Sequence, residues 1–177
     1  MQPFFISRIK MNKTYYSEET IGGIKIIVLV SRKGIKKLSL NPKENIPELS
    51  SSTKLHNDDP YLFGAFNQLR EYFSGERKKF NLPLDLEGTE FQNKVWKELQ
   101  KIPYGKTISY KTLSEKIGNV KAIRAVGKAN GQNPVAIIIP CHRVIGSNGS
   151  LTGYAGGLDI KEKLLLLEGV ISPDLFE

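Results

Sequence analysis

One stretch sets the organisation of the chain: Val135-Ala136-Ile137-Ile138-Ile139-Pro140-Cys141-His142-Arg143-Val144-Ile145. Its apolar, β-branched beginning predicts a buried strand over residues 135–139. Pro140 has no backbone N–H to donate, so the strand must end there and the chain must turn. The only cysteine of the chain follows at once, and one of its two histidines comes next. A thiol next to an imidazole at the rigid end of a strand is an arrangement that suits a nucleophilic cysteine.

Two interpretations of Cys141 are open at this level. Free cysteines are among the most buried residue types, so Cys141 could be a packing residue beside a satisfied histidine. The flanking His142 and Arg143 instead favour a thiolate. The loop over residues 146–157 contains five glycines, which favours an open site next to the thiol.

Composition bounds the class of protein. A chain of 177 residues can form one large domain or two small ones, and 40% hydrophobic with 25% charged residues is typical of globular proteins. No apolar run approaches the roughly 18 residues of a membrane-spanning helix, so no membrane partner is expected. A single cysteine excludes an internal disulfide and a multi-cysteine zinc site. We therefore expect no metal, and a reducing location that is cytoplasmic, or nuclear in a eukaryote.

The first half predicts a small sheet with a helix. Two β-branched runs, over residues 24–30 and 35–40, flank Ser31-Arg32-Lys33-Gly34, which is typical of a hairpin turn. Residues 41–60 have no periodicity and predict a loop.

Beyond this loop, apolar residues at helical spacing predict a helix over 61–73, and strict alternation predicts an edge strand over 80–86 that tolerates Pro83. We expect a scaffolding domain over residues 1–87, with the boundary at Gly88.

The second half predicts helices. Thr89 and Gln92 have the spacing of a capping box, and the helix that follows carries Trp96 as a core anchor and stops at Pro103. Ser109 can cap a second, short helix that ends at Gly118. A third helix is predicted from Lys121 to Asn130, with a buried face of small residues: Ala122, Ala125, Val126 and Ala129.

The last two helices suit a helix-turn-helix, and their segment is strongly basic. The whole chain carries a formal charge of +8, and residues 94–143 contain ten basic residues against two acidic ones. Lys121, Arg124 and Lys128 lie on one face of the third helix, with Gly127 among them. Such a basic surface is most often simply exposed to solvent, but it could also bind a polyanion such as DNA, which is the more specific hypothesis. Few long polar side chains are present, which favours binding led by shape over sequence readout.

The segment Pro140-Cys141-His142-Arg143-Val144 resembles the active-site signature of the O6-alkylguanine-DNA alkyltransferases. The downstream Thr152-Gly153-Tyr154-Ala155-Gly156-Gly157-Leu158 is similar to their bacterial branch, and the resemblance extends over roughly residues 85 to 170. It implies an α+β protein with an RNase H-like domain over residues 1–87. A mainly helical, winged-helix-like domain for DNA binding and catalysis would then span residues 88–177.

The resemblance also implies a reaction and its residues. The alkyl group of O6-alkylguanine, and of O4-alkylthymine, in double-stranded DNA would pass irreversibly to Cys141, once per molecule, without a cofactor. His142 would take the thiol proton through a water, Glu168 would orient His142, and Tyr110 would donate a proton and help to rotate the nucleotide. Arg124 would fill the gap left by the flipped base, and Asn133 would be structural. The other residues implied are Lys111, Lys121, Ala122, Gly127 and Lys128 for DNA, and Val144, Tyr154, Ala155 and Gly156 for the pocket.

The residues by themselves add to this picture or leave it open. An acidic Glu168 in the last turn of a helix that begins at Asp159 and ends at Gly169 opposes the helix dipole, which suggests a task other than helix stability. Taken alone, Arg124 could be a solvated charge and Tyr110 a packing residue. Two other functions fit the residues less well: a lesion-recognition protein, whose family lacks the cysteine, and a thiol hydrolase using Cys141 and His142, which leaves the basic helices unexplained. We expect a monomer with no obligate protein partner.

Overall fold

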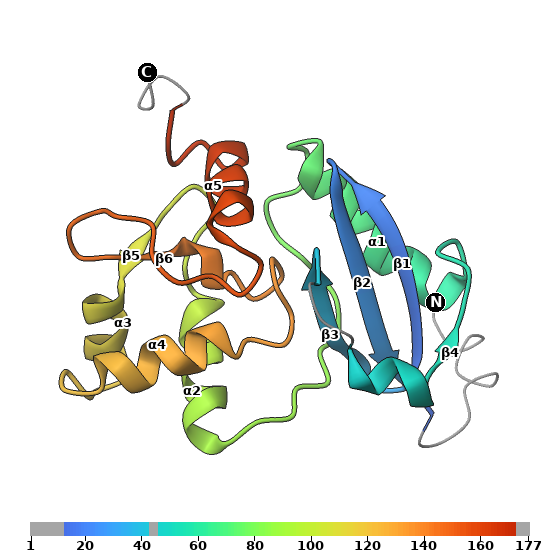
Figure 1. The fold of residues 1–177 in the computed structure, drawn as a ribbon, viewed down its shortest axis with the longest axis horizontal. Coiled ribbons are helices and arrows are strands. Elements are labelled where there is room, and N and C mark those ends of the chain that lie inside the picture. Colours follow the sequence, from blue (N-terminus) through green and yellow to red (C-terminus); the bar gives the residue numbers. More distant parts are fainter. Residues whose placement is uncertain (1–12, 43–45, 173–177) are drawn as a thin grey trace. The chain divides into compact units, whose positions relative to one another are not determined.

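The first of two units, Met1–Glu87, is a sheet covered by a helix (Figure 1). The computed structural model describes residues 13–42 and 46–172 of the chain. The sheet has the strand order β3-β2-β1-β4, with β1–β2 and β2–β3 antiparallel and β1–β4 parallel. Its elements are β1 (Tyr15–Ile21), β2 (Ile24–Ser31), β3 (Gly34–Leu40), the 3-10 helix η2 (Pro47–Ser51), β4 (Thr53–Lys54) and α1 (Pro60–Phe73).

The core of this unit lies between the central strand and α1. β2 is buried from Ile26 to Val30, and α1 buries Leu62, Phe66 and Leu69 at helical spacing. The predicted hairpin and helix are confirmed, but three expectations here need correction.

First, β1 was not expected from the sequence. Its residues are mostly polar, and Glu19 is held there by a bidentate ion pair with Arg70 at 2.7 and 2.8 Å. Second, residues 41–60 are not all loop, since they contain η2 and β4. Third, the expected edge strand over 80–86 is a single bridge between Ile35 and Leu84. The Ile35 N–H donates to the Pro83 carbonyl and the Asp85 N–H to the Ile35 carbonyl, each at 2.9 Å.

The second unit, Gly88–Glu177, is mainly helical, and together the units confirm the predicted α+β class. The helix-turn-helix is formed by α3 and α4, and α2 packs against both (Figure 1). A two-stranded parallel sheet, β5 with β6, was not expected from the sequence. The elements are α2 (Glu90–Leu99), β5 (Ile108–Ser109), α3 (Tyr110–Lys116), α4 (Ile123–Gly131), the 3-10 helix η3 (Cys141–Arg143), β6 (Val144–Ile145) and α5 (Leu158–Leu167). No helix in the described ranges has both the length and the apolar character needed to cross a membrane.

Local capping signals place three of these helices. Thr89 and Gln92 form a complete capping box at α2, and the Ser109 hydroxyl accepts the Thr112 N–H at the start of α3. α5 ends at Leu167, and Gly169, two residues later, has a positive φ of 69° that allows the Val170 N–H to donate to the Leu165 carbonyl. The start expected at Asp159 is one residue late, because α5 begins at Leu158, and Asp159 does not cap it.

The third helix of this unit differs in detail from its prediction. α4 begins at Ile123, two residues later than expected. Val126 and Ala129 are buried as expected and Ala122 is half-buried, but Ala125 is exposed. Asn130, near the end of α4, is buried although Ala125 is not. Trp96 is the expected anchor: it is 2% exposed, and its indole N–H donates to the Ala129 carbonyl at 2.9 Å.

The strand predicted over residues 135–139 is wrong, and the reason lies outside the run itself. Val135, Ile137 and Ile139 alternate in burial as a strand would, yet the backbone forms overlapping turns. The Asn133 side chain closes them, accepting the Val135 N–H at 3.0 Å and donating to the Ile139 carbonyl at 2.7 Å. Ile137 has a φ of 68°, a strained conformation for a β-branched residue.

Candidate active site and nucleic-acid interface

Cys141 begins η3, directly after the turns that Asn133 closes. Its thiol is buried, with 6% of the residue exposed, and the Asn133 side-chain amide donates to Sγ at 3.0 Å. One asparagine therefore fixes both the strained turn and the sulfur. Such strain persists only where neighbouring contacts over-determine the backbone, and it is a frequent feature of functional sites.

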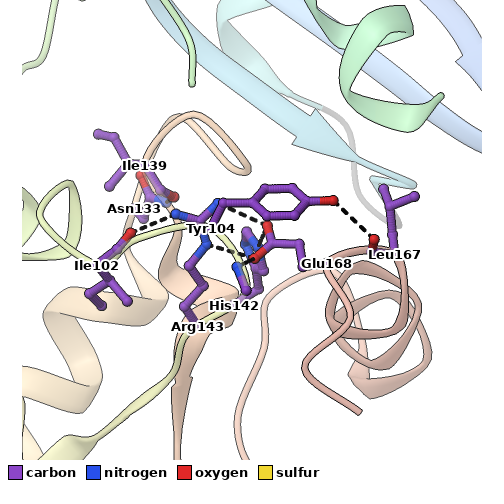
Figure 2. A network of polar contacts seen from close by, with 9 residues as sticks. Ile102, Tyr104, Asn133, Ile139, His142, Arg143, Leu167 and Glu168 are labelled. Atoms are coloured by element: carbon purple, nitrogen blue, oxygen red, sulfur yellow. Dashed lines mark hydrogen bonds and ion pairs between the residues drawn. The ribbon is translucent and has the colours of Figure 1, made fainter. Parts of the chain in front are cut away.

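A buried charge network is formed by Glu168 with His142 and Arg143, the two residues after Cys141 (Figure 2). Glu168 accepts the His142 Nε2–H at 2.8 Å and two Arg143 N–H groups at 2.8 and 2.9 Å. The remaining end of the Arg143 guanidinium donates to the Ile102 carbonyl at 2.6 Å. Nearby, the Tyr104 hydroxyl donates to the Leu167 carbonyl at 3.0 Å. The last turn of α5 is thus tied to η3 and to the chain after α2.

The network sets the charges of its members. Burial opposes ionisation of Glu168, but the bonds from His142 and Arg143 outweigh it and lower its pKa to about 2. Burial also lowers the pKa of His142, against the pull of Glu168, so the imidazole is neutral at neutral pH. Since Nε2–H is held by the carboxylate, Nδ1 carries the free lone pair. That Nδ1 atom is buried and has no hydrogen-bond partner within the described residues.

The thiol itself departs from the sequence-based expectation. Burial raises the pKa of Cys141, although the Asn133 hydrogen bond and the Lys161 charge act in the opposite direction. The flanking residues do not favour a thiolate as expected, because His142 is neutral and the Arg143 charge is matched by Glu168. Forming the thiolate therefore requires a base to remove the proton.

A cavity of about 450 Å³ opens between the helix-turn-helix and the glycine-rich loop. Its size is in the range of small-molecule sites. The Tyr110 hydroxyl is directed at the loop carbonyls of Thr152 and Gly153, at 3.4 and 3.3 Å. Burial raises the pKa of Tyr110, so it stays a proton donor. The cavity is lined by Tyr110, Ile123, Gly127, Gly131, Thr152, Gly153, Tyr154 and Ala155.

The basic face of α4 borders this cavity. Lys121, Arg124 and Lys128 are exposed, and Ile123 and Gly127 of the same helix line the cavity wall. A polyanion that contacts the basic face would therefore lie beside the cavity. No group of three or more His, Cys, Asp or Glu side chains in the described ranges is arranged to hold a metal ion.

Comparisons with known proteins agree with this geometry. Residues 14–86 match the model of the 6-O-methylguanine DNA methyltransferase ribonuclease-like domain, and residues 90–170 match that of the DNA-binding domain of the same proteins. A methylated-DNA--protein-cysteine methyltransferase of Methanosarcina acetivorans is 59% identical over 112 residues, which cover 63% of this chain and 72% of that protein. The chain belongs to the 6-O-methylguanine DNA methyltransferase family.

Solved structures of the family agree over nearly the whole chain. The Mycobacterium tuberculosis O6-methylguanine methyltransferase matches with a TM-score of 0.82 and 41% identity, covering 93% of this chain and 99% of that one. The same organism's protein in complex with DNA matches with a TM-score of 0.77 and 41% identity, covering 91% and 97%.

Within this family framework, most residues singled out by the sequence lie together. Asn133 contacts the Cys141 sulfur, and His142, the next residue, contacts Glu168. Tyr110, Tyr154 and Ala155 line the cavity. Lys111 is exposed at the start of α3. Val144 is fully buried, and neither Val144 nor Gly156 is among the residues that line this cavity.

Two polar residues at the site were missed. Lys161 is fully buried on α5, and Asn130 of α4 points its amide at the Tyr110 hydroxyl and the Cys141 carbonyl, each at 3.5 Å. A charged residue on the same helical face as Leu164 and Leu165 was the available signal for Lys161. Asn130 had no comparable signal, since asparagine near a helix end is ordinary.

Proposed function

We propose that this chain repairs DNA by direct reversal, and that Cys141 accepts the alkyl group of O6-alkylguanine, or of O4-alkylthymine, in double-stranded DNA. The observation that carries the proposal is the pairing of a buried lone thiol with a neutral histidine whose Nδ1 is unpaired and whose Nε2 is held by Glu168. Family membership, with relatives named as methylated-DNA--protein-cysteine methyltransferases, supports the same reaction.

The proton moves first. His142 Nδ1 accepts the Cys141 proton, and because the thiol has no direct hydrogen bond to His142 in this structure, one water suits the transfer. Glu168 stabilises the imidazolium that results, since its carboxylate is ionised at neutral pH. The role resembles that of the acid in other nucleophile–histidine–acid sites.

The alkyl group moves next. The Cys141 sulfur attacks the alkyl carbon, a C–S bond forms, and the C–O bond to guanine breaks with its electron pair going to the base. The guanine anion then takes up one proton, with Tyr110 as the donor at the cavity wall and the imidazolium as the source that restores it. In balance, the thiol proton ends on guanine and the alkyl group ends on sulfur.

The product is a thioether, which is a poor substrate for any nucleophile in the site. One molecule therefore performs one transfer, and no cofactor is required because the acceptor is the protein itself. The methylated-DNA--protein-cysteine methyltransferase activity is in this sense a stoichiometric reaction.

The damaged base must leave the duplex to reach the thiol. The exposed Lys111, Lys121 and Lys128 suit contacts to phosphates, while Ala122 and Gly127 let the backbone of α4 come close to the DNA. Arg124, which is exposed on the same face, would occupy the space that the flipped base leaves. A monomer without an obligate protein partner is sufficient for this chemistry, and the free thiol suits a reducing compartment such as the cytoplasm.

Intact-mass spectrometry tests the proposal. The protein is incubated with duplex DNA containing O6-methylguanine, with Cys141→Ser as the matched control. Because the chain has one cysteine, a gain of one methyl group that stops at one equivalent and is absent from the control supports the transfer. Tight binding to the lesion without a mass change would replace repair by lesion recognition, and neither binding nor transfer would overturn both.

A further inference from the structure

Lys161 is a fully buried lysine that the reaction described above does not use. Its Nζ donates to the Val144 carbonyl at 2.6 Å and to the Thr152 carbonyl at 2.8 Å. It also lies 5.9 Å from the centre of the Tyr110 ring. One ammonium therefore links α5 to β6, which follows Cys141, and to the loop that forms the cavity wall.

The charge of Lys161 is not balanced by a carboxylate. In the described part of the chain it forms no ion pair, and its two acceptors are neutral carbonyls. Burying an unpaired ammonium is costly, and here burial lowers the pKa of Lys161 to about 8, while the neighbouring Cys141 raises it. An anion nearby would stabilise an ammonium that is buried among neutral acceptors.

The titratable groups around Lys161 leave one candidate for such an anion within the protein itself. On η3, Arg143 is matched by Glu168 of α5, and His142 is neutral. Tyr110 of α3 and Tyr154 of the glycine-rich loop both have a pKa raised by burial, so both stay neutral. The other acidic residues of α5 are the exposed Asp159 and the half-buried Glu162. Among the groups of the protein itself, Cys141 is the remaining one that becomes negative at the site.

We propose that Lys161 is a positioning residue for the alkyl transfer, whose buried ammonium compensates the charge of the Cys141 thiolate and holds the Thr152 and Val144 carbonyls in place. This inference rests on the proposed transfer to Cys141. The Thr152 carbonyl is shared with the Tyr110 hydroxyl, so the same contact sets the position of the proton donor. The site is then close to neutral when the sulfur is ionised, which favours the attacking form of the nucleophile.

Two substitutions separate charge from hydrogen bonding. Lys161→Gln keeps a donor for the carbonyls and removes the charge, whereas Lys161→Arg keeps the charge. Lys163→Met on the same helix is the control, because Lys163 is exposed. Urea unfolding followed by the fluorescence of Trp96, the single tryptophan, shows whether each variant folds.

The first readout needs no DNA. The ultraviolet absorbance of the thiolate is followed against pH and compared with the same protein carrying Cys141→Ser. We expect Lys161→Gln to raise the midpoint of thiolate formation by about one pH unit or more, with Lys161→Arg and the control near the wild type. An unchanged midpoint in a folded Lys161→Gln variant would overturn the proposal.

The second readout is the single-turnover rate on duplex DNA containing O6-methylguanine. The transfer by Lys161→Gln should be about tenfold slower at pH 7, because a midpoint raised by about one pH unit lowers the thiolate fraction about tenfold. The rate should recover at higher pH. A rate lowered equally at every pH would indicate a structural role alone and would refute the charge argument. A shifted midpoint without transfer by any variant, the wild type included, would contradict the proposed function and leave the Lys161–Cys141 coupling intact.

A third measurement requires no change at Lys161. Coupling between two titrating groups is reciprocal, so Cys141→Ser must lower the pKa of the Lys161 ammonium as followed by NMR of its Cε protons. An identical Lys161 titration in the two proteins would show that the groups do not interact.

Discussion

Replacing Glu168 by glutamine should remove much of the stability of the Gly88–Glu177 unit. The carboxylate accepts hydrogen bonds from His142 and Arg143 in a buried site, and its pKa falls from 4.5 to about 2. A shift of about 2.5 pKa units corresponds to roughly 3 kcal/mol. Breaking a buried ion pair by removing one partner costs a similar amount, about 3–5 kcal/mol, because the remaining charge is left uncompensated. We therefore expect Glu168→Gln to lower the free energy of unfolding by about 3 kcal/mol at pH 7.

The pH dependence has a defined direction. A carboxyl group whose folded-state pKa is depressed contributes stability that is fully present above its unfolded pKa and is lost as the pH falls through the folded value. The wild type should therefore lose the Glu168 contribution between pH 4.5 and about pH 2, while the variant lacks this loss. The two unfolding free energies should converge over this window.

Urea unfolding followed by Trp96 fluorescence measures this directly. Trp96 is the only tryptophan and is buried in the same unit, so its signal reports on Gly88–Glu177. Glu162→Gln on α5 is the matched control and should stay within about 0.5 kcal/mol of the wild type. A loss below about 1 kcal/mol for Glu168→Gln, together with a flat wild-type profile in acid, would refute the ionised buried network.

Three further predictions concern other parts of the chain. Gly34→Ala should destabilise the Met1–Glu87 unit by several kcal/mol, because a Cβ at this position would lie 2.3 Å from the Pro83 carbonyl oxygen. Thermal unfolding followed by circular dichroism measures this loss. The control is Gly64→Ala, in open space on α1, which should be neutral or stabilising by up to about 1 kcal/mol. Asn133→Ala should cost about 2–3 kcal/mol by Trp96 fluorescence, since it leaves the strained turn at Ile137 unsupported, and an unchanged midpoint would show that the turn holds itself. Lys121→Ala should reduce the slope of log binding constant against log salt by about 0.9 for duplex DNA, and an unaltered slope would remove Lys121 from the phosphate contacts.

Much of the local structure could be predicted from the sequence because its signals are short-range. The Thr89–Gln92 capping box, the Ser109 cap and the Gly169 stop involve residues within a few positions of one another, and all three form as expected. The apolar spacing of α1 depends in the same way on the helical period alone. The signature around Cys141 likewise predicted the candidate nucleophile and its neighbours without any tertiary information.

The tertiary structure decided the features that depend on distant partners. The β-branched run before Cys141 alternates in burial as a strand does, so its pattern could not reveal the turns that the Asn133 side chain imposes. Arg143 was expected to favour the thiolate, but its guanidinium forms an ion pair with Glu168, 25 residues further along the chain. The burial of Lys161 beside the Cys141 site follows from the packing of α5 against η3. Charge balance in a buried site depends on which groups are brought together, and a linear sequence does not contain that information.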